Sequence, residues 1–296
     1  MTNRNQVLVH HQPAAAMWGR GGRDYDEVSF AISDALAHAA QRLNARASER
    51  ILDVATGTGW SARNVARRGA EVTAVDISPE LLAAASDLSA HVKPPIEYLV
   101  ADAERLPFDD AAFDGVISTF GVMFAIDQAA AATELGRVCR TGGRLTLATW
   151  APQGAVAEFF EVIARHSDAP PPPSSPLAWG DQAYVKKLLG NAFELKFEQG
   201  ISNAYHGSIE DIWDWYTRGF GPRCASSLRP YLRIAWGGSS RISMLIISIT
   251  LSRPGCMCGA NTHSLLAAGD EPPLGGYARD ATARCNHLMR QADDHA

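Results

Sequence analysis

The sequence predicts an α/β protein whose doubly wound, mostly parallel sheet of seven strands carries helices on both faces. Between residues 50 and 150, short apolar segments of strand length alternate with helical patterns. A glycine-rich turn follows the first of these segments directly, and an aspartate follows each of the next two. Strands that alternate with helices in this way are typical of parallel sheets covered on both sides.

Five strands are expected in this region, at residues 50–54, 71–75, 96–100, 113–118 and 144–150. Apolar residues at helical spacing predict helices at 28–44, 61–68, from 79 onward, and at 128–139, the last ending before a turn at Gly142 and Gly143. Ser78 is expected to cap the helix that starts at Pro79, because serine is favoured before the first turn and proline within it.

The pattern loosens after Trp150. Helices are expected at 156–166, 182–189 (capped by Asp181) and 209–216, and strands at 193–197 and 244–251 complete the seven. The composition changes after Asp214: 27 of the 32 acidic residues precede residue 215, and residues 215–269 contain none. Two interpretations stay open, a divergent segment with a disordered tail or a foreign terminus from an altered reading frame. Either way, residues 252–296 are expected to add little to the core.

Composition excludes several classes of protein. An apolar fraction of 46% over 296 residues allows a sizeable core, and a net charge of -5 gives no electrostatic footprint for nucleic acid. No apolar run approaches the roughly 18 residues of a membrane span, and the first residues lack the apolar centre of a signal peptide. Five cysteines without framework spacing do not indicate a secreted scaffold. We expect a soluble cytoplasmic protein with neither a nucleic-acid nor a membrane partner; the oligomeric state is not indicated.

The glycine-rich turn carries the first candidate site. Thr56, Gly57 and Gly59 follow the first strand, where glycine lets the backbone turn tightly and approach a ligand closely. Alone, this turn also fits a dinucleotide fingerprint. Asp53, at the end of the strand, suits a ligand with an ammonium group and a sulfonium, whereas it would repel a pyrophosphate.

Three further strand ends complete the candidate site. Asp76 and Ile77 end the second strand, where a carboxylate can accept both hydroxyls of a ribose, whichever adenosine cofactor carries them. Asp102 and Ala103, past the third strand, are expected at the adenine. Thr119 and Phe120 end the fourth strand, at the edge where open α/β sheets bind ligands.

The motifs ILDVATGTG, AVDIS, ADAERLPFDDAAFD and VCRTGGRLTLATW resemble those of class I S-adenosylmethionine-dependent methyltransferases, in particular the group typified by ubiquinone/menaquinone C-methyltransferases. The resemblance implies a Rossmann-like methyltransferase fold and S-adenosylmethionine as cofactor, with S-adenosylhomocysteine as product. It also implies Gly57 and Gly59 at the methionyl part, Asp76 at the ribose, and Asp102 with Ala103 at the adenine. Thr141 departs from the family, which usually has proline there.

The acceptor side is less defined. Trp18 and Tyr25 are expected to form an N-terminal lid over the cofactor, with ordinary packing as the alternative, and Phe120 and Phe124 to line an acceptor pocket. No residue is identified as catalytic. His10, His11, His166 and His206 are possible bases, but each taken alone is expected to be a surface or structural histidine. No metal site is expected, because Cys256 and Cys258 lack a paired C-x-x-C motif.

These expectations divide the chain into a lid and helix (1–48), a cofactor-binding core (49–151), a substrate-side cap with the remaining strands (152–251) and a tail (252–296). The function expected is methyl transfer to a small-molecule acceptor by in-line displacement. Two alternatives stay open: an NAD(P)-dependent oxidoreductase, or a nonenzymatic S-adenosylmethionine-binding protein.

Overall fold

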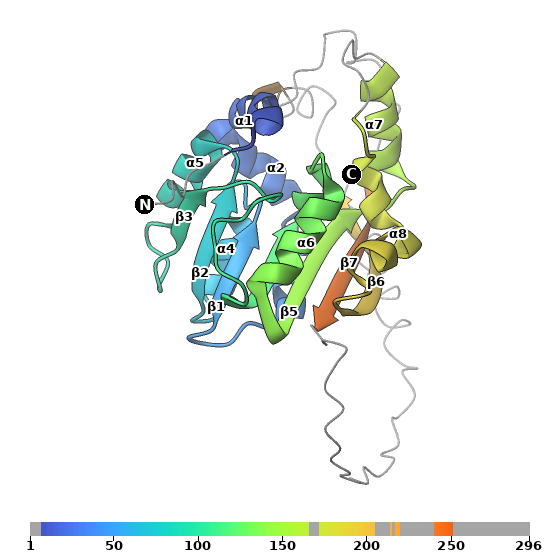
Figure 1. The fold of residues 1–296 in the computed structure, drawn as a ribbon. Helices are drawn as coiled ribbons and strands as arrows, with labels where there is room; N and C mark the ends of the chain where they lie inside the picture. Colours follow the sequence, from blue (N-terminus) through green and yellow to red (C-terminus); the bar gives the residue numbers. More distant parts are fainter. Residues whose placement is uncertain (1–6, 166–171, 205–213, 215–216, 220–239, 251–296) are drawn as a thin grey trace, which may run out of the picture. The chain divides into compact units, whose positions relative to one another are not determined.

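The computed structural model describes residues 7–165, 172–204, 214, 217–219 and 240–250. Its central sheet has the strand order β3-β2-β1-β4-β5-β7-β6 (Figure 1). In chain order the strands are β1 (Arg50–Val54), β2 (Glu71–Asp76), β3 (Glu97–Val100), β4 (Phe113–Thr119), β5 (Cys139–Trp150), β6 (Glu194–Ala204) and β7 (Ser240–Thr250). Strands β1 to β5 pair in parallel, whereas β7 lies antiparallel between β5 and β6. The predicted α/β class with a parallel five-stranded core is confirmed.

Helices precede the sheet and connect its strands. In chain order the helices of the described residues are η1 (Val9–His11), α1 (Gln12–Gly19), η2 (Gly22–Asp24), α2 (Tyr25–Ala31), α3 (Ser33–Leu43), α4 (Trp60–Ala66), α5 (Pro79–Ser89), η3 (Val122–Phe124), α6 (Gln128–Val138), α7 (Ala155–Arg165), η4 (Pro176–Gly180) and α8 (Gln182–Leu189). Within this part of the chain, no helix is long and apolar enough to cross a bilayer.

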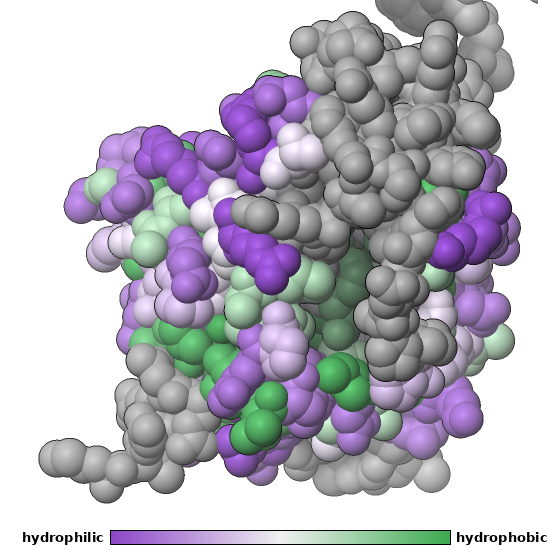
Figure 2. Space-filling view, turned by 90° about the horizontal axis from the view of Figure 1, so that it is seen from above, coloured by the Kyte–Doolittle hydropathy of each residue, from purple (hydrophilic) through white to green (hydrophobic). Residues whose placement is uncertain are grey.

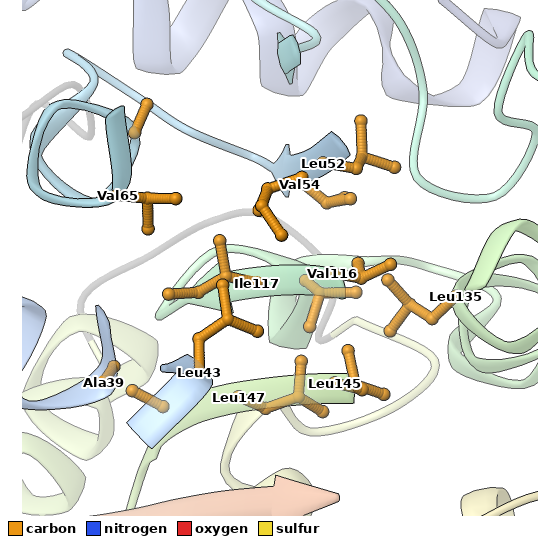
Figure 3. Packing of buried hydrophobic residues seen from close by; sticks show 14 of the residues in the cluster. Ala39, Leu43, Leu52, Val54, Val65, Val116, Ile117, Leu135, Leu145 and Leu147 are labelled. Atoms are coloured by element: carbon orange, nitrogen blue, oxygen red, sulfur yellow. The ribbon is translucent and has the colours of Figure 1, made fainter. Parts of the chain in front are cut away.

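The core lies on both faces of the parallel strands. Val116 and Ile117 are neighbours on β4 and point to opposite faces, as successive strand residues do. Figure 3 shows Ile117 directed toward Leu43 of α3 and Val116 toward Leu135 of α6. All four side chains are fully buried, and burial of each such side chain contributes about 1.5–3 kcal/mol. The sheet is therefore covered on both sides, as the strand–helix alternation predicts.

Two predicted helix caps are confirmed. Leu81 donates its backbone N–H to the Ser78 hydroxyl at the start of α5. Asp181 Oδ1 accepts from the backbone N–H groups of Ala183 and Tyr184 at the start of α8. These side chains satisfy donors that the first helical turn leaves without partners.

Several predicted boundaries are wrong: β6 extends to Ala204 instead of 197, and β7 begins at Ser240 instead of 244. The single helix expected at 28–44 breaks at Ile32, whose φ of −120° and ψ of 21° separate α2 from α3. Asp34 stabilises the break, because its Oδ1 accepts from Ala35 N and from the distant Ser202 hydroxyl. Strand β5 begins at Cys139 instead of 144. Where the turn is expected, the pairing of β5 with β4 is irregular, and Gly142 has a φ of +74°. The expected helix at 209–216 and the tail at 252–296 lie outside the described residues, Asp214 excepted.

Candidate functional site

A cleft lies at the carboxyl ends of the parallel strands, beneath α1 and α2. Its empty volume, open mouth included, is about 990 Å³. Figure 2 looks down on this edge and shows apolar surface at its middle with hydrophilic surface around it. The lining residues include His11, Ala14, Trp18, Tyr25, Ser29, Ile32, Ala55, Thr56, Gly57, Trp60, Ser61, Asp76, Ile77, Ala101, Asp102, Ala103, Thr119, Phe120, Gly121, Val122 and Phe124.

The two glycines of the loop after β1 have different roles. Gly57 has φ +57° and faces the cleft, where an added Cβ would lie 3.5 Å from Cε1 of Tyr25. Gly59 has φ +83°, and its Cβ would lie only 2.8 Å from the Tyr98 hydroxyl. Gly59 does not line the cleft. Gly57 therefore leaves room for a ligand, whereas Gly59 allows the loop to pack on its support.

Asp76 lies at the end of β2 and is almost fully buried. Its Oδ2 accepts from Gly57 N at 2.9 Å and its Oδ1 accepts from Ser78 N at 2.9 Å. Burial raises the pKa of this carboxyl, although the backbone N–H donors oppose the shift. The backbone N–H of Ile77 also interacts with this carboxyl. Because an ionised carboxylate has about four acceptor positions, it can still accept a hydrogen bond from the cleft side.

Asp53 is fully buried and does not line the cleft. Its Oδ2 accepts from the Thr56 hydroxyl at 2.7 Å, and its Oδ1 has no hydrogen-bond partner among the described residues. Burial raises the pKa of Asp53 to about 7, against the lowering effect of the Thr56 hydrogen bond. Asp53 is therefore not placed to contact a ligand directly, because Thr56 lies between its carboxylate and the cleft.

Asp102 connects the loop after β3 to the N-terminal segment. Its Oδ2 accepts from His11 Nδ1 at 2.7 Å and from Leu8 N at 3.1 Å, and its Oδ1 accepts from Glu104 N at 3.0 Å. Burial opposes ionisation of Asp102, yet these hydrogen bonds lower its pKa. Asp102 lines the cleft, and Oδ1 keeps one acceptor position for a ligand.

Glu104 gathers further groups beside this contact. Its Oε2 lies 2.7 Å from His10 Nε2 and its Oε1 lies 3.2 Å from His11 Nε2. Asp127 N donates to Oε1 at 2.6 Å. Burial disfavours a charged His11 ring, but the hydrogen bond to Asp102 and the charges of Asp102 and Glu104 outweigh it and raise the pKa of His11.

The backbone is strained at the centre of the cleft. Ala55 and Phe120 both have φ of +56°, which non-glycine residues rarely adopt. A Cβ at Gly121 would lie 2.4 Å from the Cβ of Ala55, so the loops after β1 and β4 approach closely only because residue 121 is glycine. Strain of this kind concentrates at functional sites.

Aromatic side chains cover the cleft from the N-terminal side. Trp18 of α1 packs edge-on against Tyr25 and Phe124, with ring centroids 6.1 and 5.2 Å apart. Burial and the nearby charge of Asp76 raise the pKa of Tyr25. Arg63 of α4 donates to Asp26 at 3.1 Å and thereby holds α2 against the core.

The structure brings most of the predicted site together. The cleft is lined by ten predicted residues: Trp18, Tyr25, Thr56, Gly57, Asp76, Ile77, Asp102, Ala103, Thr119 and Phe120. Asp53 and Gly59 lie behind it. Phe124, which is predicted to line an acceptor pocket together with Phe120, also lines the cleft. The roles of all these residues stay predictions.

Two of the lining residues that sequence reasoning missed have polar groups at the cleft. His11 is expected from the sequence to be a surface or structural histidine, and it is buried in the wall of the cleft, 91 residues in sequence from its partner Asp102. Trp60 lines the cleft, and its buried Nε1 has no hydrogen-bond partner in the described part of the chain. Its place directly after Gly59 was the available signal.

Comparisons with known proteins point to one family. A family model described as a methyltransferase domain matches residues 52–147. An uncharacterised protein of Mycobacterium tuberculosis is 36% identical over 216 residues, which cover 70% of this chain and 76% of the relative. The demethylmenaquinone methyltransferase of Beutenbergia cavernae is 32% identical over 209 residues, covering 64% of this chain and 85% of the relative.

Solved structures share the fold. The YcgJ protein of Bacillus subtilis superposes with a TM-score of 0.55 at 21% identity, covering 75% of this chain and 99% of that protein. The [4+2]-cyclase SpnF superposes with a TM-score of 0.55 at 19% identity, covering 74% and 81%. At this identity the likeness concerns the fold alone, and one fold can carry several reactions.

Proposed function

Because this chain belongs to the class I S-adenosylmethionine-dependent methyltransferases, we propose that its cleft binds S-adenosylmethionine and that it transfers the methyl group to a small-molecule acceptor. The observation that carries the proposal is the meeting of Gly57, Asp76 and Asp102 in one cleft. These residues come from three strand ends and suit three parts of the cofactor. The residues present therefore fit the cofactor that members of this family generally use.

Each part of the cleft has a proposed role. Asp76 accepts the two ribose hydroxyls with the acceptor positions that Gly57 N and Ser78 N leave free. Ile77 and Ala103 enclose the adenine, and Asp102 Oδ1 accepts a hydrogen bond from its amino group. Gly57 gives room for the methionyl part, beside Thr56.

Asp53 influences the cofactor indirectly, through the Thr56 side chain. Its carboxyl group orients the Thr56 hydroxyl and, when ionised, places negative charge behind the methionyl site. That charge favours a cationic ligand and disfavours the pyrophosphate of NAD(P).

The bound cofactor supplies a methyl group already activated by its sulfonium. The chain must hold the acceptor in line and exclude water. We propose that Trp18 and Tyr25 serve as a lid, and that Phe120 and Phe124 border the acceptor. In this proposal residues 1–48 form the lid and the helix that follows it, 49–151 the cofactor-binding core and 152–251 the rest of the acceptor side.

Calorimetric titration with S-adenosylhomocysteine and with NAD tests the cofactor assignment. We expect saturable binding of S-adenosylhomocysteine alone, and binding of NAD alone would overturn the assignment. Turnover of labelled cofactor with phenols, quinones and amines then tests the reaction. Cofactor binding without turnover of any acceptor would favour a nonenzymatic binding protein.

A further inference from the structure

A cluster of side chains of the kinds that bind metal ions lies next to Asp102, at the wall of the cleft. His10 and His11 come from η1 and Glu104 from the loop after β3, 94 residues along the chain from His10. One potential ligand atom from each lies within 4.8 Å of the others. Two imidazoles and a carboxylate form a donor set typical of zinc and related divalent transition metals.

The Nε2 atoms of the two histidines lie next to different oxygens of the same carboxylate. His10 Nε2 lies 2.7 Å from Oε2 of Glu104, and His11 Nε2 lies 3.2 Å from Oε1. Metal–ligand bonds of about 2.0–2.2 Å place neighbouring ligand atoms about 3.3–3.6 Å apart at a tetrahedral centre. A small separation of the three side chains would therefore make room for one cation that contacts both rings and Glu104.

Asp102 fixes His11 in the form that a metal requires. The ionised carboxylate can only accept, so His11 Nδ1 donates to Asp102 Oδ2 at 2.7 Å. When the ring is neutral, this contact leaves its lone pair on Nε2, which faces Glu104; a metal bound there would displace the proton that the two nearby carboxylates favour. A carboxylate behind a histidine ligand is a recurrent arrangement in metal sites, where it sets the tautomer and the ring orientation.

The surroundings of the cluster leave a path for a metal ion from solvent, and they include one hydrogen bond that metal binding would break. The side chain of His10 is 47% exposed, whereas those of His11 and Glu104 are buried. Asp127 N donates to Glu104 Oε1 and keeps this carboxylate in place. Metal binding would replace one long hydrogen bond, from Ile126 N to His11 Nε2 at 3.3 Å.

We propose that His10, His11 and Glu104 bind one divalent transition-metal cation of the zinc class, which fastens the N-terminal segment to the loop after β3. Both segments line the cleft, through His11 and through Asp102. A cation at this position would cross-link them. The proposal does not rest on methyl transfer, because the metal alone is the probe.

The test titrates the untagged full-length chain with Co²⁺, followed by visible absorption, and with Zn²⁺, followed by calorimetry. We expect one equivalent to bind and the melting temperature to rise with metal. His10→Ala should weaken binding at least about tenfold, and Glu104→Gln more, as ligand losses exceed the 10–100-fold effect of outer-sphere changes. His38→Ala is the matched control, because His38 also faces a glutamate, Glu198, on the surface, and it should bind as the unaltered chain does.

Three outcomes would overturn the proposal. The first is the absence of saturable binding. The second is equal affinity in His10→Ala, Glu104→Gln and the unaltered chain. The third is a strong near-ultraviolet charge-transfer band with Co²⁺ that reports thiolate ligands, because it would assign the metal to cysteines such as Cys256 and Cys258.

Discussion

The floor and the cover of the cleft are built in different ways. The floor consists of strand ends, where Asp76 binds the loop at Gly57 through a hydrogen bond between residues 19 apart. The cover, residues 7–31, is attached by contacts between distant segments, such as His11 to Asp102 and Trp18 to Phe124. The floor is therefore specified by short motifs, whereas the cover is specified only once the chain has folded.

This difference predicts how substitutions in the two regions behave. A change in the floor removes space or hydrogen bonds that no other residue supplies. A change in the cover weakens one of several parallel contacts, because Arg63 with Asp26 and the histidine contacts still hold the segment in place. Floor substitutions should accordingly cost more cofactor affinity than cover substitutions.

The largest effect is expected for Gly57→Val. A branched residue at φ +57° is strained, and its side chain would fill the space under Tyr25. Binding of S-adenosylhomocysteine, measured by calorimetry, should be abolished while the circular dichroism spectrum stays native. Gly142→Val is the control, because it imposes similar strain at φ +74° outside the cleft and should retain binding. Normal binding by Gly57→Val would remove this loop from the site.

Asp76→Ala should have the next largest effect. Hydrogen bonds to a charged group contribute about 1.5–3 kcal/mol and are not additive, so loss of both ribose contacts should cost about 2–3 kcal/mol, or roughly 30- to 150-fold in affinity. Glu97→Ala, at an exposed carboxylate that begins β3, is the matched control. An unchanged affinity in folded Asp76→Ala would contradict the ribose assignment.

Asp53→Asn should reveal a pH-dependent stability. The folded-state pKa of about 7 exceeds the unfolded value of about 3.9, so the folded chain keeps this proton while the unfolded chain loses it. This carboxyl therefore reduces the free energy of unfolding as pH rises from about 4 to 7, by at most about 4 kcal/mol for three pKa units. Denaturant titrations should show Asp53→Asn to be more stable than the unaltered chain at pH 8, and closer to it at pH 5. The same stability difference at both pH values would contradict the shifted pKa.

The smallest effect is expected in the cover. Trp18→Ala removes two aromatic contacts, each worth about 0.5–1.5 kcal/mol, of which only the part gained on closure affects the ligand. We expect S-adenosylhomocysteine to bind about three- to tenfold more weakly, mainly through faster dissociation in stopped-flow measurements. Phe30→Ala, at a side chain 67% exposed on the same segment, should change affinity less. A loss as large as that of Asp76→Ala would erase the distinction between floor and cover.

Local sequence signals predicted the parallel core and most of the floor. Ser78 and Asp181 mark helix starts because a cap acts within one turn of the chain, and Gly57 marks the loop because few other residues adopt its conformation. The same local reasoning placed Asp53 at the ligand. It could not show that Thr56 would stand between them, because that depends on how the loop turns.

Tertiary contacts decided the rest. The continuous helical pattern from 28 to 44 gives no sign of the break at Ile32, nor of the hydrogen bond that Ser202, 168 residues away, donates to Asp34 just after it. Taken singly, His10 and His11 give no sequence signal of a shared site, because the two rings approach Glu104 only in the folded chain. Periodicity and spacing predict contacts between residues that are close in sequence. They do not predict contacts between residues that are distant in sequence and come together only in the fold.

The position of β7 has a consequence for how the protein is made. Among the described strands, β6 lies at the edge of the sheet and pairs only with β7, although β7 is synthesised later. While a ribosome is still translating the intervening residues, β5 has an open flank and β6 has nothing to join. The nascent chain can assemble β1 to β4 early, but the sheet closes only after Ser240–Thr250 has emerged, so an unpaired flank stays available to other chains during that delay.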